Sequence, residues 1–189
     1  MTGNDMKKQV VYIFGASGSG TTTLAAKLRD MLGYYLIDTD DYLWEPTDPP
    51  YTTKRTGQER FRLMKSDIDL HGSVVISGSL TGWGDGLIPD LTLAVRVETE
   101  TAVRIERLRK REHARFGARI EEGGDMYDIH RALIEWASAY DHAGHEIRSK
   151  AMHDEWQKRL TCPLITVDGS LPPEENLKLI EAALDPAQA

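Results

Sequence analysis

The chain has 189 residues, of which 40% are hydrophobic and 28% are charged, a composition typical of a soluble protein with one globular domain. Its single cysteine, Cys162, excludes an intramolecular disulfide, and no apolar run is long enough to cross a membrane. We therefore expect a cytoplasmic protein that has no membrane partner.

The net charge of −7 is unevenly distributed along the chain. Between Arg96 and Arg119, eight Lys or Arg residues accompany four Asp or Glu residues, which gives +4 for this stretch and −11 for the remainder. A nucleic-acid-binding protein usually has a wider basic surface, so we expect no nucleic-acid partner. The pattern favours a small, strongly anionic ligand such as a nucleotide.

Predicted strands and helices alternate from the start of the chain. The apolar run over 9–14 (QVVYIF) is typical of a buried parallel strand, and a glycine-rich loop follows it directly. Leucine and methionine at helical spacing predict an amphipathic helix over 21–32, which Gly33 ends. A second strand is predicted over 34–37, and it leads into the acidic cluster 38–41.

Prolines at 46, 49 and 50 exclude regular structure from the next segment, which is a candidate substrate-binding loop. The later elements continue the alternation, so the chain is predicted to form a parallel α/β sheet covered by helices on both faces. We expect a helix over 58–70, strands over 74–77, 91–97 and 164–167, an arginine-rich helix over 100–114, a hinged loop over 116–128, a helix containing Ile129 to Tyr140, and a last helix over 173–184.

The glycine-rich loop follows the pattern G-x-x-x-x-G-K-[ST], with threonine in the place of lysine. In this motif backbone N–H groups turn toward phosphate oxygens, the following helix contributes its positive N-terminus, and a hydroxyl group binds Mg²⁺. The strand before the loop and the helix after it are the context that the motif requires. The residues predicted to bind ATP and Mg²⁺ are Gly15, Ala16, Ser17, Gly18, Ser19, Gly20, Thr21 and Thr22.

Thr21 cannot supply the positive charge that phosphoryl transfer requires at the β- and γ-phosphates. Either arginines of the 104–119 stretch enter the site, or the protein binds nucleotide and catalyses phosphoryl transfer slowly or not at all. The spacing of Arg104, Arg107 and Arg111 predicts one helix face with three guanidinium groups, and Arg115 and Arg119 lie in a glycine-flanked loop. The catalytic candidates among these are Arg107, Arg111, Arg115 and Arg119.

Two other interpretations of the loop remain open. One is the dinucleotide site of an NAD(P)-dependent oxidoreductase, with Asp38 binding a ribose. Against it, the glycines are spaced G-x-x-G-x-G, and no Tyr-x-x-x-Lys pair follows. The other interpretation is a tight turn that binds no ligand.

Other candidate site residues lie at predicted strand ends and in loops. Asp38 and Asp40 follow the second strand, where a carboxylate can bind Mg²⁺ or accept a substrate proton, although Asp also favours solvated turns. Arg60 is a candidate phosphate clamp. Trp44, Gly78 and Trp83 lie in the two loops predicted to face the substrate, where the tryptophans either stack on a planar ligand or anchor their loops.

Together these motifs resemble the adenylate-kinase and shikimate-kinase group of P-loop kinases, and more closely its adenylate-kinase-related bacterial proteins with a GASGSGTTT loop. The likeness covers nearly the whole chain, and its two distinctive segments are GASGSGTTTLA at 15–25 and RFGARIEEGGDMY at 115–127. The matching segments are GASGSGTTTLA at 15–25, DTDDY at 38–42, SGS at 77–79, the arginines at 104, 107 and 111, RFGARIEEGGDMY at 115–127 and VDGSLPPEEN at 167–176.

The resemblance implies one P-loop domain with a five-stranded parallel sheet. Its core comprises 8–40, 72–105 and 160–189, with a substrate insert over about 41–71, after strand two, and a lid over about 106–150, after strand four. It also implies that Asp38 or Asp40 lies near the metal or the substrate hydroxyl, and that Asp168 and Gly169 lie where the adenine base packs. The sequence departs from the family in the missing lysine and in Ser77-Gly78-Ser79, where an aspartate is usual.

The loop and the resemblance together predict a phosphotransferase that moves the γ-phosphoryl group of Mg·ATP to a small acceptor. A nucleoside monophosphate is the leading candidate, by analogy of fold. The alternative is a non-catalytic nucleotide-binding protein. We expect a monomer or a homodimer.

Overall fold

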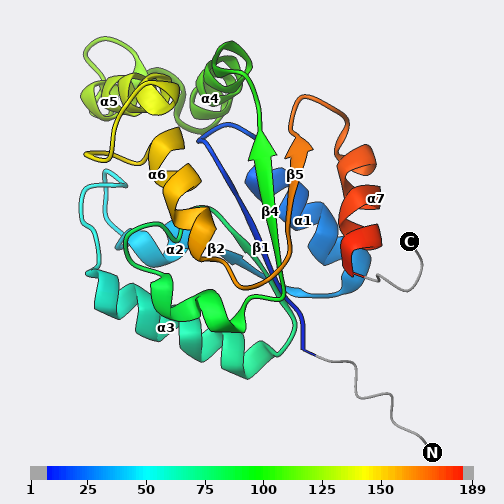
Figure 1. The fold of residues 1–189 in the computed structure, drawn as a ribbon. Helices are drawn as coiled ribbons and strands as arrows, with labels where there is room; N and C mark the ends of the chain where they lie inside the picture. The colour runs from blue at the N-terminus through cyan, green and yellow to red at the C-terminus, as the bar shows by residue number, and fades with distance from the viewer. Residues whose placement is uncertain (1–7, 185–189) are drawn as a thin grey trace, which may run out of the picture.

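Five parallel strands form the central sheet of the computed structural model, which describes residues 8–184. The strand order is β2-β3-β1-β4-β5, so the carboxyl ends of all five strands lie at one edge (Figure 1). This confirms the predicted α/β fold class. The strands are β1 (Val10–Gly15), β2 (Tyr35–Asp38), β3 (Val74–Ser77), β4 (Leu93–Glu98) and β5 (Leu164–Asp168).

Helices cover both faces of the sheet. Figure 1 shows α1 and α7 on one face and α3 and α6 on the other, while α4 and α5 lie beyond the carboxyl ends of the strands. The α-helices are α1 (Thr21–Leu32), α2 (Thr39–Leu43), α3 (Gly57–His71), α4 (Thr101–Phe116), α5 (Tyr127–Ser138), α6 (Lys150–Trp156) and α7 (Pro173–Leu184). Short 3₁₀ helices are η1 (Asp85–Asp90), η2 (Gly117–Ile120), η3 (Ala139–Asp141) and η4 (Gln157–Arg159).

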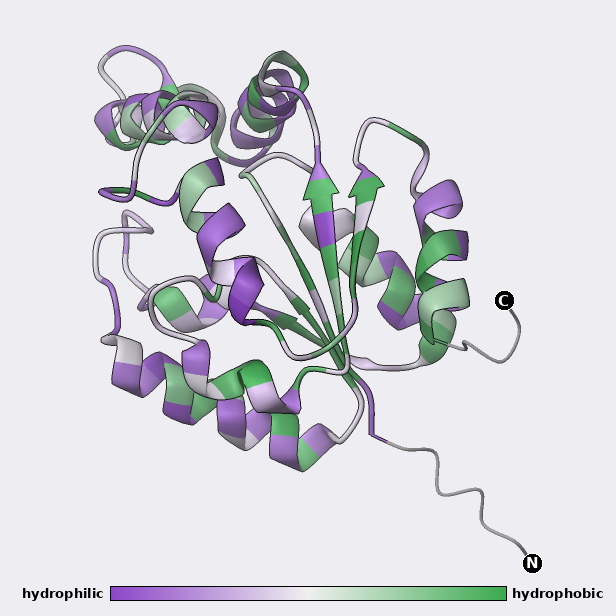
Figure 2. Ribbon diagram, in the orientation of Figure 1, coloured by the Kyte–Doolittle hydropathy of each residue, from purple (hydrophilic) through white to green (hydrophobic). Residues whose placement is uncertain are grey.

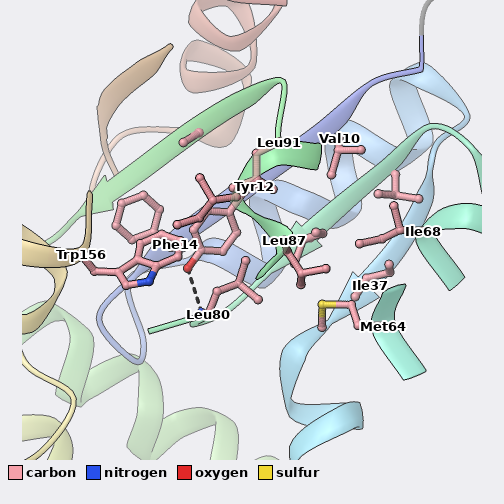
Figure 3. Close-up of a cluster of buried hydrophobic side chains, with 14 residues drawn as sticks. Val10, Tyr12, Phe14, Ile37, Met64, Ile68, Leu80, Leu87, Leu91 and Trp156 are labelled. Atoms are coloured by element: carbon pink, nitrogen blue, oxygen red, sulfur yellow. Dashed lines mark hydrogen bonds between the residues drawn. The ribbon is translucent and has the colours of Figure 1, made fainter. Parts of the chain in front are cut away.

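The side chains of β1 alternate between two hydrophobic clusters, one on each face of the sheet. Tyr12 and Phe14 pack with Met64 of α3 and Trp156 of α6 (Figure 3). Val11 and Ile13 pack on the other face with residues of α1 and α7. Because both faces are covered, the strand is continuously hydrophobic, which Figure 2 shows as green strands between two-coloured helices.

Two short helices, α2 and α6, are absent from the sequence-based prediction. They span five and seven residues, too few for a helical hydrophobic period to be recognised. Their N-caps explain them, because Asp38 accepts a hydrogen bond from the backbone N–H of Asp40 at 3.0 Å, and Ser149 accepts one from that of Met152 at 3.1 Å. The predicted hinged loop over 116–128 also contains the 3₁₀ helix η2.

Within residues 8–184, every helix is too short or too polar to cross a lipid bilayer.

Candidate active site

The glycine-rich loop lies between the end of β1 and the start of α1, as its sequence predicts. Gly18 has a φ of +80°, and a side chain at this position would begin 2.5 Å from the carbonyl oxygen of Arg104. The loop therefore turns tightly against α4, and only glycine fits at this point. Its backbone leads directly into the N-terminal end of α1, where four helical N–H groups have no helical acceptor.

Contacts from α4 and from the short segment between β4 and α4 hold the loop in place. The hydroxyl of Thr99 donates to the carbonyl oxygen of Ser19 at 3.1 Å, and a guanidinium nitrogen of Arg104 donates to that of Ser17 at 3.4 Å. Arg104 is fully buried and pairs with Asp141 at 2.8 Å. The expected face of three arginines on α4 is therefore wrong, because Arg104 points into the protein and supports the loop.

Oxygen atoms from three chain segments meet beside the loop. The hydroxyl of Thr22 lies 3.4 Å from a carboxylate oxygen of Asp38 and 3.2 Å from the hydroxyl of Ser77. Burial raises the pKa of Asp38, and the neighbouring charges of Asp40 and Asp41 add to this effect. Thr22 and Asp38, which are predicted metal ligands, thus lie together, and Ser77 is an addition that the sequence analysis did not single out.

Asp40 differs from Asp38 in its surroundings. The helix α2 starts at Thr39, so the two-residue alternation of a strand does not continue through the acidic cluster. Asp38 uses one carboxylate oxygen to cap this helix, whereas Asp40 and Asp41 are exposed. Asp40 is therefore free to face a ligand at the edge of the sheet.

A cavity of about 260 Å³ opens on the other side of the loop, between α1, α4 and α7. A guanidinium nitrogen of Arg107 donates to the carbonyl oxygen of Gly169 at 2.8 Å across its rim. Asn176 donates its amide N–H to the carbonyl oxygen of Asp168 at 2.7 Å, and its own amide oxygen is enclosed with no hydrogen-bond partner within residues 8–184. Residues lining the cavity include Ser19, Gly20, Thr23, Arg107, Gly169 and Asn176.

The other predicted catalytic arginines have different partners. Arg111 pairs with the buried carboxylate of Glu112 at 2.9 Å, and Arg119 pairs with Asp48 at 2.9 Å and with Asp125. The guanidinium of Arg115 instead lies over the ring of Tyr51 at 5.6 Å and donates to its hydroxyl. Contacts from 115–119 thus reach the segment after α2, which brings these distant parts of the chain together.

The predicted acceptor-side residues lie on α3, in the segment after β3 and in the segment after α2. Arg60 lies over the ring of Trp83 at 4.7 Å, and Trp83 donates its indole N–H to the carbonyl oxygen of Ser79 at 2.9 Å. Trp44 lies in the segment after α2 and contacts the ring of Tyr51 at 5.6 Å. Gly78, at a φ of +115°, lies against Thr39 at the start of α2.

A family model described as an AAA domain matches residues 11–126, more than half of the chain. The chain belongs to this AAA domain family. The uncharacterized protein YqaC of Bacillus subtilis (strain 168) is 40% identical over 163 residues, which are 86% of this chain and 89% of that protein. Shikimate kinase 2 of Sodalis glossinidius (strain morsitans) is 34% identical over 82 residues, 42% of this chain and 46% of that protein.

Solved kinase structures resemble this AAA domain protein in fold. Shikimate kinase from Aquifex aeolicus superposes with a TM-score of 0.55 at 18% identity, over 95% of this chain and 98% of that chain. Deoxyadenosine kinase from M. mycoides with bound dATP superposes with a TM-score of 0.59 at 14% identity, over 94% and 100%. The protein therefore has the fold of these P-loop kinases, while the likeness to adenylate kinases in particular stays a prediction.

A buried histidine connects the segment after β3 with α6 of the AAA domain protein. The two ring nitrogens of His153 lie 3.2 Å from the hydroxyl of Ser79 and 2.8 Å from that of Tyr140. Burial, followed by the positive charges of Arg148 and Arg96, lowers the pKa of His153 to about 3. The imidazole is therefore neutral in the folded protein at neutral pH.

We expect His153 to make the folded protein sensitive to acid. A histidine has a pKa near 6.5 in the unfolded chain, so below that pH the unfolded state binds a proton that the native state excludes down to about pH 3. As the pH is lowered from about 6.5 to about 3, the free energy of unfolding should decrease by up to about 1.4 kcal/mol per pH unit. Urea unfolding of the wild type and of H153Q at several pH values measures this difference. The exposed His142→Gln is the control, and parallel profiles for wild type and H153Q would contradict the prediction.

Sequence analysis missed Ser77, Asn176 and Arg148 as residues of functional interest. Ser77 and Asn176 stand within segments that were noted for other reasons, but serine and asparagine are too common to be distinctive. Arg148 stands in the short segment between η3 and α6, where no motif surrounds it. Only the folded arrangement shows that its side chain has no acidic partner among the described residues.

Proposed function

We propose that this protein binds Mg·ATP and transfers its γ-phosphoryl group to a small acceptor. The observation that carries this proposal is the position of Thr22, Asp38 and Ser77 beside the glycine-rich loop. Oxygen ligands next to a backbone loop that can bind phosphate are the arrangement a magnesium–nucleotide complex requires. The kinase-like fold is consistent with this activity.

Thr22 and Asp38 fit a magnesium ion because both offer oxygen atoms at the end of the loop. When bound, magnesium neutralises charge on the phosphates during transfer. Within residues 8–184 no group of three or more His, Cys, Asp or Glu side chains could hold a metal ion. The phosphate oxygens of the nucleotide would therefore complete the coordination. The N–H groups of residues 15–22 would hold these phosphates.

Two arginines are the best candidates for the positive charge that Thr21 lacks. Arg107 donates to a carbonyl oxygen and Arg115 to a tyrosine hydroxyl, so among the residues that the structure describes neither is neutralised by a carboxylate in an ion pair. Arg111 and Arg119 hold carboxylates and would have to exchange these partners for a phosphate. We therefore assign to Arg115, in a lid over 106–150, the role of supplying the positive charge that Thr21 lacks. Arg107 would lie beside the adenine base of the nucleotide.

The acceptor would bind across the substrate insert over 41–71 and the segment after β3. Asp40 is the candidate for accepting the proton of an acceptor hydroxyl, and Arg60, Trp44, Gly78 and Trp83 would surround the molecule. Closure of the lid would exclude water, since hydrolysis of ATP otherwise competes with transfer. A nucleoside monophosphate remains our leading acceptor candidate.

An ADP-release assay tests this function. Mg·ATP is offered with nucleosides, nucleoside monophosphates, sugars and shikimate-like acids, and ADP release that depends on one acceptor is the expected result. The variant R115Q should lower kcat by roughly 10²- to 10³-fold, since it removes a charge needed in the transition state. The exposed Arg109→Gln on the same helix is the matched control. A Thr21→Lys variant tests whether the usual lysine raises the rate.

ATP binding without turnover on any acceptor, by both the natural protein and the T21K variant, would favour the non-catalytic nucleotide-binding protein. A titration with NADPH followed by fluorescence separately tests the oxidoreductase interpretation, which predicts saturable binding. The ADP-release assay and the NADPH titration therefore distinguish the non-catalytic nucleotide-binding protein from the oxidoreductase.

A further inference from the structure

Tyr51 has a strained backbone in the segment that follows α2. Among the residues that the structure describes, it is the one residue other than glycine with a positive φ, +67°. A bulky side chain disfavours this conformation, which persists only where the surrounding contacts hold it. Such outliers gather at functional sites, which makes the side chain of Tyr51 a candidate for a role in the proposed site.

The side chain of Tyr51 contacts residues of both the insert and the end of α4. The rings of Trp44 and Phe116 lie edge-on to its ring, at 5.6 and 6.4 Å between centroids. The guanidinium of Arg115 lies over the ring of Tyr51 at 5.6 Å and over that of Phe116 at 5.1 Å, and it donates to the Tyr51 hydroxyl. The insert and the lid therefore meet at Tyr51, where two aromatic rings and a hydroxyl hold one guanidinium.

A second arginine of the lid meets the same part of the insert in a different way. Asp48, three residues before Tyr51, pairs with Arg119 at 2.9 Å, and Asp125 pairs with Arg119 as well. Two carboxylates thus neutralise Arg119, whereas a hydroxyl holds Arg115. Burial raises the pKa of Tyr51, so this hydroxyl stays neutral at physiological pH. Tyr51 therefore fixes Arg115 without cancelling its charge.

Fixing an arginine in advance matters when it has to bind a phosphate. Arg115 stands in the last turn of α4 and is exposed, so its long side chain would otherwise lose its rotamer freedom on binding. The charges of Asp40 and Glu112 both act on Tyr51, which places it between the lid and the sheet edge beside the glycine-rich loop. The contact with Tyr51 thus orders Arg115 close to the proposed phosphate site.

We propose that Tyr51 is a positioning residue, which holds the guanidinium of Arg115 ready for the phosphates of the nucleotide. Tyr51 touches neither phosphate nor acceptor and acts only through Arg115. This inference rests on the proposed function, which assigns to Arg115 the charge that Thr21 lacks. It adds that the substrate insert, and not the lid alone, determines where this charge lies.

A double-mutant titration of the full chain tests whether Tyr51 acts through Arg115. Binding of a non-hydrolysable ATP analogue with Mg²⁺ is measured by isothermal titration for the wild type, Y51F, R115Q and the double variant. Y51F keeps the ring and loses only the hydroxyl, so it should weaken binding roughly 3- to 10-fold, the usual effect of one hydrogen bond. Adding Y51F to R115Q should change the affinity by less than about 2-fold, since the side chain that Tyr51 positions is then gone.

Tyr127→Phe is the matched control for Y51F. Tyr127 is a second tyrosine of the lid, and Arg131 lies over its ring at 5.9 Å. Because neither residue belongs to the proposed phosphate site, Y127F should bind the analogue as the wild type does.

Hydrogen exchange of the Arg115 guanidinium protons, measured by NMR on the protein without nucleotide, tests the positioning directly. Loss of the hydroxyl acceptor in Y51F should make this exchange roughly 3- to 10-fold faster than in the wild type. The guanidinium protons of the exposed Arg109 on the same helix should exchange equally fast in both proteins.

Equal binding of the analogue by Y51F and the wild type would overturn the inference. The same loss of affinity from Y51F in the wild-type and R115Q backgrounds would also overturn it, as would unchanged exchange of the Arg115 protons. Failure of the wild type to bind the analogue would instead count against the proposed function, and the exchange measurement alone would then decide whether Tyr51 holds Arg115.

Discussion

Replacing Arg104 by glutamine should lower the free energy of unfolding by about 3–5 kcal/mol, the usual effect of removing one partner from a buried ion pair. The side chain is fully buried, and its loss leaves the carboxylate of Asp141 without its cation. The carbonyl oxygens of Thr99 and Ala137 would also lose the donors that reach them at 3.0 and 3.2 Å. The same change releases Ser17, so the phosphate loop should bind nucleotide more weakly.

Urea unfolding of R104Q against R109Q measures the effect on stability. Arg109 lies on the same helix and is exposed, so its loss should change the free energy of unfolding by less than about 0.5 kcal/mol. Equal stability of the two variants would show that Arg104 does not support the loop as its contacts indicate. Titration with an ATP analogue, under conditions where R104Q is folded, measures the second effect.

Replacing Gly78 by alanine should disrupt the edge of the sheet where the acceptor is proposed to bind. An added Cβ would begin 1.8 Å from the hydroxyl oxygen of Thr39, and the φ of +115° disfavours any residue with a side chain. That hydroxyl accepts a hydrogen bond from the backbone N–H of Ser79 at 3.2 Å. The start of α2, and with it the capping Asp38, would have to move.

Gly82→Ala is the matched control for G78A. Gly82 lies in the same loop with a φ of +82°, but nothing lies within 4 Å of an added Cβ. Its substitution should cost about 1–2 kcal/mol from backbone strain alone, and G78A should cost roughly 2 kcal/mol more because the added atom overlaps its neighbours. Urea unfolding and magnesium-dependent nucleotide binding measure both effects. Equal losses for the two variants would contradict the steric explanation.

The strand and helix pattern was largely predictable from the sequence because it depends on local order. The third strand over 74–77, the first helix over 21–32 and the last helix over 173–184 have the predicted bounds. Their hydrophobic residues follow the period of the element, and glycine or proline marks their ends. The helices α2 and α6 were missed because a capping side chain, not a period, starts them.

Candidate site residues likewise fall into those that nearby sequence specifies and those that depend on contacts between distant segments. The glycine-rich loop and Asp38 were identified because a short motif and a strand end specify their neighbours within a few residues. The roles of Arg104 and Arg111 could not be assigned, since an arginine looks the same in sequence whether it meets a buried carboxylate or faces solvent. Asp141 stands far along the chain from Arg104, and only packing of α4 against α5 and η3 brings the pair together.

The sequence by itself determined the α/β fold, the phosphate loop that lacks its lysine, and the order of the five strands and the longer helices along the chain, because each depends on residues near one another. Tertiary structure alone decided which arginines pair with carboxylates within residues 8–184, that Ser77 joins Thr22 and Asp38, and that Arg148 forms no ion pair among these residues. Those facts depend on distances between segments far apart in the chain, and such distances are fixed only when the hydrophobic faces of the helices close on the sheet.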